Sequence, residues 1–344
     1  MRWSSRAGLR LAILVQFVLA AVVLGGCTQL ADTSLPQTTV FPASDFGDMI
    51  QDLYVLIFWM ALVVFVGVEG FLLFTIFRYR RRREGELPSQ VHGNTRLEVA
   101  WTIIPSIILL IIAVPTIQTI FASDTVPPTA TQYVKVVGHQ WWWEFQYPNL
   151  GVVTANELHV PLGETVRFDL TSADVIHSFW FPRMGGKMDV VPTRTNHMWF
   201  TPRETGEFAG QCVEFCGTQH ANMRMRLIVQ SPADFQAWVA QQRAEAGTPA
   251  PGTPAAAGAE VFQRSACIAC HTVRGTNSRG VIGPDLTHVG GRRTIAAGML
   301  DNTPEEMSRW IRDPQGIKPG NKMVLAPPND QDLAAIVAYL QSLK

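Results

Sequence analysis

Two long apolar segments dominate the first third of the chain. They cover roughly Leu53 to Phe77 and Val99 to Phe121, and each is long enough to cross the hydrocarbon core of a membrane as a helix of about 20 residues. Between them lies the basic run Arg78-Tyr-Arg-Arg-Arg-Arg83. By the positive-inside rule this loop stays in the cytoplasm, so both flanks lie outside. The pattern predicts a transmembrane hairpin over residues 28–122 and an exported remainder.

A shorter apolar stretch, Leu11 to Leu24, precedes the hairpin. Three arginines come before it and Leu24-Gly-Gly-Cys27 ends it, which is the pattern of an export signal. The ending resembles a bacterial lipobox, whose cysteine becomes the lipidated first residue of the mature chain. We interpret residues 1–27 as a lipoprotein-type signal peptide with Cys27 as the lipidation site. An ordinary signal peptide with an incidental cysteine is the alternative.

After about Thr131 the pattern changes to short runs rich in Val, Thr and aromatic residues with Gly and Pro between them. Such runs favour a small antiparallel sandwich or barrel, here over residues 123–243. Residues 244–257 are mostly Ala, Pro, Gly and Thr, the composition of a semi-flexible linker. Residues 258–344 contain a helical stripe of Leu333, Ile336, Val337 and Leu340. The expected fold class is therefore multidomain: a two-helix hairpin, an all-β sandwich and an all-α domain.

Composition adds two limits. A chain of 344 residues exceeds the size at which one hydrophobic core usually keeps growing, in agreement with several domains. The formal net charge of zero gives no argument for a nucleic-acid partner. The five cysteines are few, and their spacing suggests metal and cofactor chemistry more than a disulfide framework.

Soft metal ligands are concentrated between Cys212 and Met223. Cys212, Cys216 and His220 follow one another at intervals of four, and Met223 comes three further on. His177 is the best candidate for a remote imidazole, and the combination favours copper, with the second thiolate suggesting two ions. A Cys212–Cys216 disulfide or a zinc site remains possible. Neither explains Met223, because zinc rarely takes a thioether.

A second motif, Cys267-Ile-Ala-Cys270-His271, is the attachment signature of a c-type haem. A thioredoxin-like pair is the alternative, but it does not account for the histidine. The sixth iron ligand is one of four residues: Met299, Met307, Met323 or His288. Met323 is favoured because it follows a Lys-Pro-Gly-Asn-Lys loop just before the last predicted helix.

Residues from about 50 to 230 resemble subunit II of the haem-copper cytochrome c oxidases. The resemblance is carried by the two-helix hairpin, Gly138-His-Gln-Trp-Trp-Trp-Glu-Phe, Asp174-Val-Ile-His-Ser-Phe and the cysteine loop. Residues from about 256 to 344, with Gly283-Pro-Asp-Leu, resemble class I cytochromes c. Together they resemble the caa-type subunit II, in which a cytochrome c is fused behind a cupredoxin-like copper domain.

The resemblance implies a binuclear CuA centre bridged by Cys212 and Cys216. Its other expected ligands are His177, His220, Met223 and the backbone carbonyl of Glu214. The Glu214 carboxylate is expected to help hold a magnesium ion shared with subunit I.

The resemblance also implies one covalently bound haem c, on Cys267 and Cys270. His271 and Met323 would be its axial ligands, and the carbonyl of Pro284 would accept from the proximal imidazole.

Two further residues gain expected roles from the family. Trp141 corresponds to the residue through which electrons enter the copper centre, and the alternative is that some of Trp141 to Trp143 are sandwich core. Glu98 corresponds to a glutamate at the mouth of a proton pathway, and the alternative is an ordinary interfacial carboxylate.

The implied function is that of subunit II of a respiratory cytochrome c oxidase in a bacterial cytoplasmic membrane. Electrons from an external donor, a cytochrome c or a cytochrome bc complex, would pass through haem c and copper to subunit I. There dioxygen is reduced to water with proton translocation, and this chain performs no dioxygen chemistry itself. The expected partners are subunit I, subunit III, the donor and membrane lipid, and no nucleic acid. A copper-delivery protein and an electron carrier for a different reductase remain the alternatives.

Overall fold

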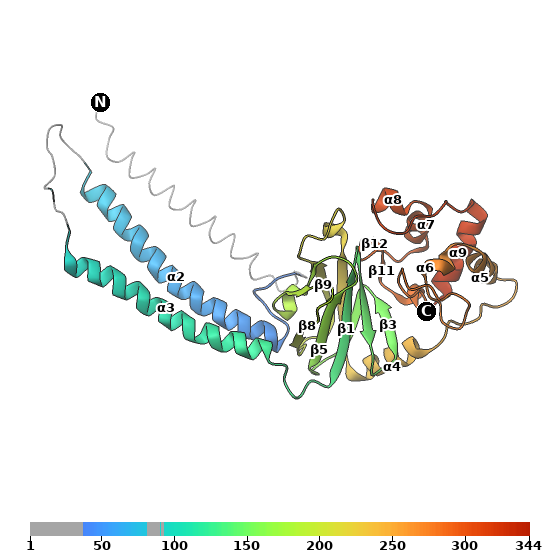
Figure 1. Cartoon of the computed structure of the whole chain (residues 1–344), viewed down its shortest axis with the longest axis horizontal. Helices are drawn as coiled ribbons and strands as arrows, with labels where there is room; N and C mark the ends of the chain where they lie inside the picture. Colours follow the sequence, from blue (N-terminus) through green and yellow to red (C-terminus); the bar gives the residue numbers. More distant parts are fainter. Residues whose placement is uncertain (1–36, 81–89, 91–92) are drawn as a thin grey trace, which may run out of the picture.

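The computed structural model describes residues 37–80, 90 and 93–344, and it places the hairpin, a β-sandwich and a mostly helical domain in that order (Figure 1). The signal-peptide prediction, with Cys27, and part of the basic loop lie outside the described residues.

The hairpin consists of α2 (Asp45–Arg78) and α3 (Thr95–Asp124), which lie side by side and contain the two predicted spans (Figure 1). Both helices are long and apolar enough to cross a membrane. Their ends are capped by Ser44 Oγ, which accepts from Gly47 N, and by the side chain of Asn94, which accepts from two amides of the first turn. Helix α3 continues through Pro105 and Pro115, which membrane-spanning helices tolerate because neighbouring groups can satisfy the freed carbonyls.

Two five-stranded sheets form the sandwich. One has the order β3 (Val152–Ala155), β2 (Trp142–Tyr147), β1 (Gln132–His139), β5 (Val166–Ser172), β8 (Asn196–Phe200). The other has the order β4 (Glu157–Pro161), β10 (Arg224–Gln230), β9 (Gly206–Cys212), β6 (His177–Trp180), β7 (Met188–Val190).

Most neighbouring strands are antiparallel, as the sequence predicts, but β1 pairs with β5 and β4 pairs with β10 in parallel. The expectation of a purely antiparallel sandwich is therefore wrong. The strands of each of these two pairs are distant in sequence. No local sequence pattern predicts whether such strands pair in parallel or antiparallel.

The interior of the sandwich is aromatic. Its largest fully buried side chains come from both sheets and include Trp143, Tyr147, Phe145, Phe168, Phe179 and Phe200. Helix α4 (Pro232–Arg243) closes one end, and Phe235 and Val239 on this helix are buried in the same core. A rigid core of this kind fixes the ends of β6 and β9, where the candidate metal ligands lie.

The C-terminal domain contains α5 (Pro254–Arg264), α6 (Cys267–Cys270), α7 (Pro304–Arg312), α8 (Pro314–Ile317) and α9 (Asp330–Ser342), with a small hairpin of β11 (Thr294–Ile295) and β12 (Leu300–Asp301). Short 3-10 turns cover Pro182–Met184, His220–Asn222 and Val289–Gly291.

Helices α5 and α9 pack tightly against each other. A Cβ atom on Gly258 would lie 1.9 Å from the carbonyl oxygen of Ala335, so only glycine permits this approach. The predicted stripe on α9 is buried, which confirms the expected inner face of the last helix. Helix α5 begins at Pro254, inside the Ala/Pro/Gly stretch, because proline is well accommodated in the first helical turn.

Candidate metal and haem sites

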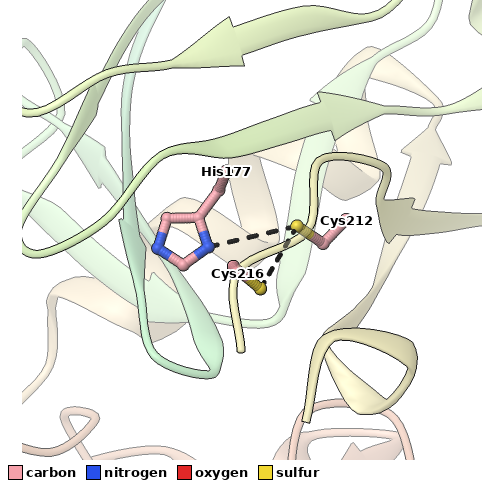
Figure 2. Close-up of side chains that lie close together, drawn as sticks. All are labelled: His177, Cys212 and Cys216. Atoms are coloured by element: carbon pink, nitrogen blue, oxygen red, sulfur yellow. Dashed lines mark hydrogen bonds between the residues drawn. The ribbon is translucent and has the colours of Figure 1, made fainter. Parts of the chain in front are cut away.

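Three residues of the cysteine-loop site come from two adjacent strands and the loop that follows them. His177 begins β6, Cys212 ends β9, and the two strands pair through Phe179 and Cys212. Cys216 lies in the loop after β9 and turns back, so that its Sγ is 3.7 Å from Cys212 Sγ (Figure 2). His177 Nδ1 lies 4.0 Å from Cys212 Sγ, and all three side chains are buried (Figure 2).

The other three predicted ligand residues converge on the same two sulfur atoms. His220 Nδ1 lies 3.6 Å and Met223 Sδ 3.9 Å from Cys216 Sγ, while the carbonyl oxygen of Glu214 lies 3.3 Å from Cys212 Sγ. The loop closes because Cys212 N donates to Met223 O, which brings its two ends together. The structure thus places all six residues of the predicted set around one centre.

The donor set fits copper. Two sulfurs, two imidazole nitrogens, a thioether and a carbonyl oxygen are what a soft, thiolate-rich copper centre uses. The sulfur atoms lie 3.7 Å apart, well beyond a disulfide bond of about 2.0 Å, and both cysteines are free thiols.

Asp174 sets the orientation of His177. Its Oδ1 lies 2.9 Å from His177 Nε2, which leaves Nδ1 facing the sulfurs, as outer carboxylates do for metal-bound histidines. The same carboxylate accepts from the amides of Gln140 and Val175 and from Lys322 Nζ. Burial opposes ionisation of Asp174, but these donors together hold its pKa well below the usual range.

The contact between the two thiols lowers the pKa of Cys212 and raises the pKa of Cys216. A hydrogen bond from the Cys216 thiol lowers the pKa of Cys212, with a further contribution from His177, against the effect of burial. The thiolate is the form that binds a metal, so one ligand is favoured in its binding form by its own neighbours.

The three tryptophans of the aromatic run have different surroundings. Trp141 Nε1 donates to the carbonyl oxygen of Cys216 at 2.9 Å, so this indole lies directly on the cysteine loop. Trp143 is fully buried against Phe179, and Trp142 stacks on His139 with ring centroids 4.2 Å apart. The sandwich-core interpretation therefore holds for Trp143, whereas Trp141 is next to the candidate copper site.

In the C-terminal domain, α6 carries the two motif cysteines at its ends and His271 follows at once. His271 Nδ1 lies 2.8 Å from the carbonyl oxygen of Pro284, as the family pattern predicts for a proximal histidine. A Cβ on Gly283 would lie 2.6 Å from the ring, so glycine is needed there. Burial lowers the pKa of His271, which favours the neutral imidazole that iron requires.

The candidates for the sixth iron ligand differ in their contacts. Met307 is buried and its sulfur lies 3.7 Å from Gln341 Nε2, while both ring nitrogens of His288 face backbone carbonyls. Met323 is half-buried against the core of the domain, and Asn321 Oδ1 accepts from its backbone N–H. Among the described residues its sulfur makes no hydrogen bond, whereas the Met307 sulfur and the His288 ring nitrogens already have polar partners.

Glu98 lies in the first turn of α3 and is exposed. Its Oε1 accepts from Asn94 N at 3.3 Å, so the carboxylate takes part in the cap of this helix. The structure therefore gives Glu98 a local role at the start of this helix.

Sequence reasoning missed three residues that the structure places beside the sites: Asp174, Lys322 and Lys318. Asp174 precedes His177 by three residues, which is a signal for an outer carboxylate. The two lysines come from the loop before Met323 and reach the copper domain only through folding.

Comparison with known proteins agrees with this arrangement. Family models match three parts of the chain: cytochrome c oxidase subunit II, transmembrane domain, at residues 38–119; the periplasmic domain of the same subunit at 151–231; and cytochrome c at 255–344. Cytochrome c oxidase subunit 2 of Alkalihalophilus pseudofirmus is 42% identical over 93% of this chain and 94% of that protein. The subunit 2 of Bacillus subtilis is 34% identical over 96% of this chain and 97% of that protein.

A solved structure also aligns with the chain. The periplasmic domain of subunit II of cytochrome oxidase of Bradyrhizobium japonicum is 35% identical, with a TM-score of 0.34, and the match covers 35% of this chain and 97% of that one. Relatives that match nearly the whole chain, hairpin and C-terminal domain included, are oxidase subunits. The chain therefore belongs to the family of cytochrome c oxidase subunit 2, in the form that carries a C-terminal cytochrome c domain.

Proposed function

We propose that this chain is the subunit through which electrons enter a respiratory cytochrome c oxidase, using a copper pair on the cysteine loop and a covalently attached haem on the C-terminal domain. Its family makes it part of a haem-copper terminal oxidase with an electron-transfer role, and the domain matches imply copper and haem. The observation that carries the finer proposal is the convergence of four donor residues on the sulfurs of Cys212 and Cys216, which lie 3.7 Å apart. When bound, copper and haem supply one-electron exchange.

For copper, Cys212 and Cys216 are the proposed bridging thiolates and His177 and His220 the terminal ligands. Met223 and the carbonyl of Glu214 are the weak ligands, and the Glu214 carboxylate would help hold magnesium at the contact with subunit I. Support comes from the arrangement itself: the ligand atoms already face one another, so little rearrangement is needed on binding.

For the haem, Cys267 and Cys270 would form the covalent links and His271 and Met323 the axial pair. The contact between His271 Nδ1 and Pro284 O orients the imidazole with Nε2 available to iron.

The proposed direction of transfer follows the order of the domains. Electrons from a cytochrome c or a cytochrome bc complex enter at the C-terminal domain and leave through the copper domain toward subunit I, with Trp141 on the route. Subunit I reduces dioxygen to water with proton translocation, subunit III is a further partner, and Glu98 would lie at the mouth of one proton pathway. The hairpin sits in a bacterial cytoplasmic membrane with both redox domains on its outer side.

Replacing a bridging cysteine tests the copper proposal. Cys216→Ser should abolish the near-infrared absorption and the multi-line copper resonance of a mixed-valence pair, while the haem spectrum remains. Cys267→Ser is the matched change, which should alter haem attachment and leave the copper signals. Survival of both copper signals in Cys216→Ser would exclude bridging thiolates.

Replacing the sixth iron ligand tests the haem proposal. Met323→Ala should lower the haem potential and open the iron to carbon monoxide, because a thioether ligand raises the potential and occupies the site. Met299→Ala, at another half-buried methionine of the domain, should change neither. An unchanged potential in Met323→Ala would move the axial role to another residue.

Two measurements test the cellular context. Isolation of the chain from its own membrane without a haem-copper subunit I would contradict the oxidase assignment. Palmitate labelling that persists in Cys27→Ala would show that Cys27 is not the lipid anchor.

A further inference from the structure

The C-terminal domain inserts a lysine into the copper domain. Lys318 Nζ donates to the carbonyl oxygens of Trp141 and Asn222, both at 2.8 Å, and to that of Ala296 at 3.3 Å. The first two acceptors belong to the copper domain, and Lys318 is only 3% exposed. A buried ammonium is costly unless its donors are satisfied, and here three acceptors surround it only when the two domains touch.

The turn after Lys318 covers Trp141. Gln219 Nε2 donates to the carbonyl oxygen of Pro319 at 2.9 Å. A Cβ on Gly320 would lie 3.3 Å from Thr218 Oγ1 and 3.7 Å from the Trp141 ring, and its φ of +83° is one that favours glycine. As a result, Trp141 is only 9% exposed, and the surface above it is occupied by the C-terminal domain.

A second contact region lies away from Trp141. The buried carboxylate of Glu157 in β4 accepts from the backbone amides of Arg293 and Thr294 at 2.7 and 2.9 Å. Arg224 N donates to the carbonyl oxygen of Ala297 at 3.1 Å. These three amides therefore have hydrogen-bond partners across the domain interface.

We propose that Lys318 pins the C-terminal domain onto the copper domain as one fixed unit, so that the Trp141 surface serves the chain's own cytochrome domain and is closed to a soluble electron carrier. The use of Trp141 for electron transfer rests on the proposed function, whereas the docking rests on the contacts alone. The occupant of this surface is a defined segment, Lys318–Gly320, which lies three residues before the proposed iron ligand Met323.

Hydrogen–deuterium exchange of the purified oxidase tests the docking directly. In Lys318→Met, which keeps the apolar stem and removes the two hydrogen bonds donated to the copper domain, exchange at the amides of Arg224, Arg293 and Thr294 should rise by about tenfold or more, because each lost bond weakens docking. Lys344→Met, the same change at an exposed lysine of the same domain, should leave these rates unchanged. If Lys318→Met does not fold, Gln219→Ala should raise the same rates by a smaller factor.

A second measurement addresses access to Trp141. The assay follows reduction of copper by a soluble cytochrome c in the Cys267→Ser variant, which lacks the haem attachment. Copper reduction should be slow in this variant and faster in the double variant Cys267→Ser, Lys318→Met. Equal rates would overturn the claim that the surface is closed.

The outcomes separate docking from function. The docking proposal is wrong if the amides of Arg224, Arg293 and Thr294 exchange in the wild type as fast as those of residues 247–250. It is also wrong if Lys318→Met leaves their exchange rates unchanged. Protected amides in a protein that contains neither copper nor haem would leave the docking standing and refute the proposed function instead.

Discussion

Asp174→Asn is a small change at a carboxylate that contacts both His177 of the candidate copper site and Lys322 in the loop before Met323. Oδ1 of Asp174 accepts from Val175 N and His177 Nε2, and Oδ2 accepts from Gln140 N and Lys322 Nζ. An amide offers one acceptor oxygen and one donor group. In either orientation of the new side chain, two of these four donors therefore face an N–H group.

The cost can be estimated from these contacts. Loss of a hydrogen bond from Gln140 N to a charged, mostly buried acceptor costs about 1.5–3 kcal/mol. The Lys322 side chain is 57% exposed, so its ion pair adds at most about 1 kcal/mol. The sum of about 2–4 kcal/mol corresponds to a decrease in melting temperature of about 8–16 °C for the copper domain, taking about 4 °C per kcal/mol.

Thermal loss of the near-infrared copper absorption in the purified oxidase measures this decrease. Asp189→Asn, at an exposed carboxylate of the same domain, is the matched control and should shift the midpoint little.

The pH dependence gives a second check. The pKa of Asp174 is lowered in the folded protein, so its stabilisation is complete above the unfolded value of about 3.9 and is lost only as the pH falls through the folded value. The difference between the two proteins should therefore be constant from pH 5 to 8. A shift under about 2 °C, or one that disappears within that range, would refute the reasoning.

Three other changes have outcomes that follow from single contacts. Gly258→Ala places a Cβ 1.9 Å from Ala335 O and should destabilise the C-terminal domain by about 1–3 kcal/mol in a melt followed by the haem spectrum, whereas Gly247→Ala, with open space around it, should not. Gly138→Ala places a Cβ 2.8 Å from His177 Cδ2 and should displace that ring, which copper analysis and the near-infrared band would report as a weakened copper site. Glu157→Ala removes the acceptor of the Arg293 and Thr294 amides, so protection of these two amides in hydrogen–deuterium exchange, corrected for intrinsic exchange, should fall.

The hairpin and the ligand set could be predicted because their signals are local. A membrane span depends on length and apolar composition. Five of the six copper-site residues lie within a dozen positions, where the loop between β9 and β10 must bring them together. The c-type haem motif is likewise contiguous. His177 was found because it begins a strand beside an aromatic segment, and the pairing of β6 with β9 carries it to Cys212.

The domain interface could not be predicted from the same sequence. Lysine is the residue type least often buried, and nothing near Lys318 indicates that its partners lie 177 and 96 positions away, at Trp141 and Asn222. The parallel pairing of β1 with β5 was missed for the same reason. The domain interface and the β1–β5 pairing both depend on contacts between segments that are distant in sequence. Such contacts produce no periodic pattern of apolar residues in either segment.

Docking changes what limits electron transfer between the domains, and the linker offers a test. A flexible tether alone holds two domains at an effective concentration in the millimolar range that falls roughly as the −3/2 power of linker length. Doubling the linker with Gly and Ser after Gly247 would then slow the encounter about threefold. If docking instead adds about 1 kcal/mol for each of the two hydrogen bonds that Lys318 donates to the copper domain, the docked state is favoured about 30-fold over the tethered one. The same insertion costs docking only about 0.6 kcal/mol, so the domains stay together. Flash-induced electron transfer from haem to copper should then keep its wild-type rate in the lengthened protein. A threefold decrease would mean that the tether, and not the interface around Lys318, sets the encounter.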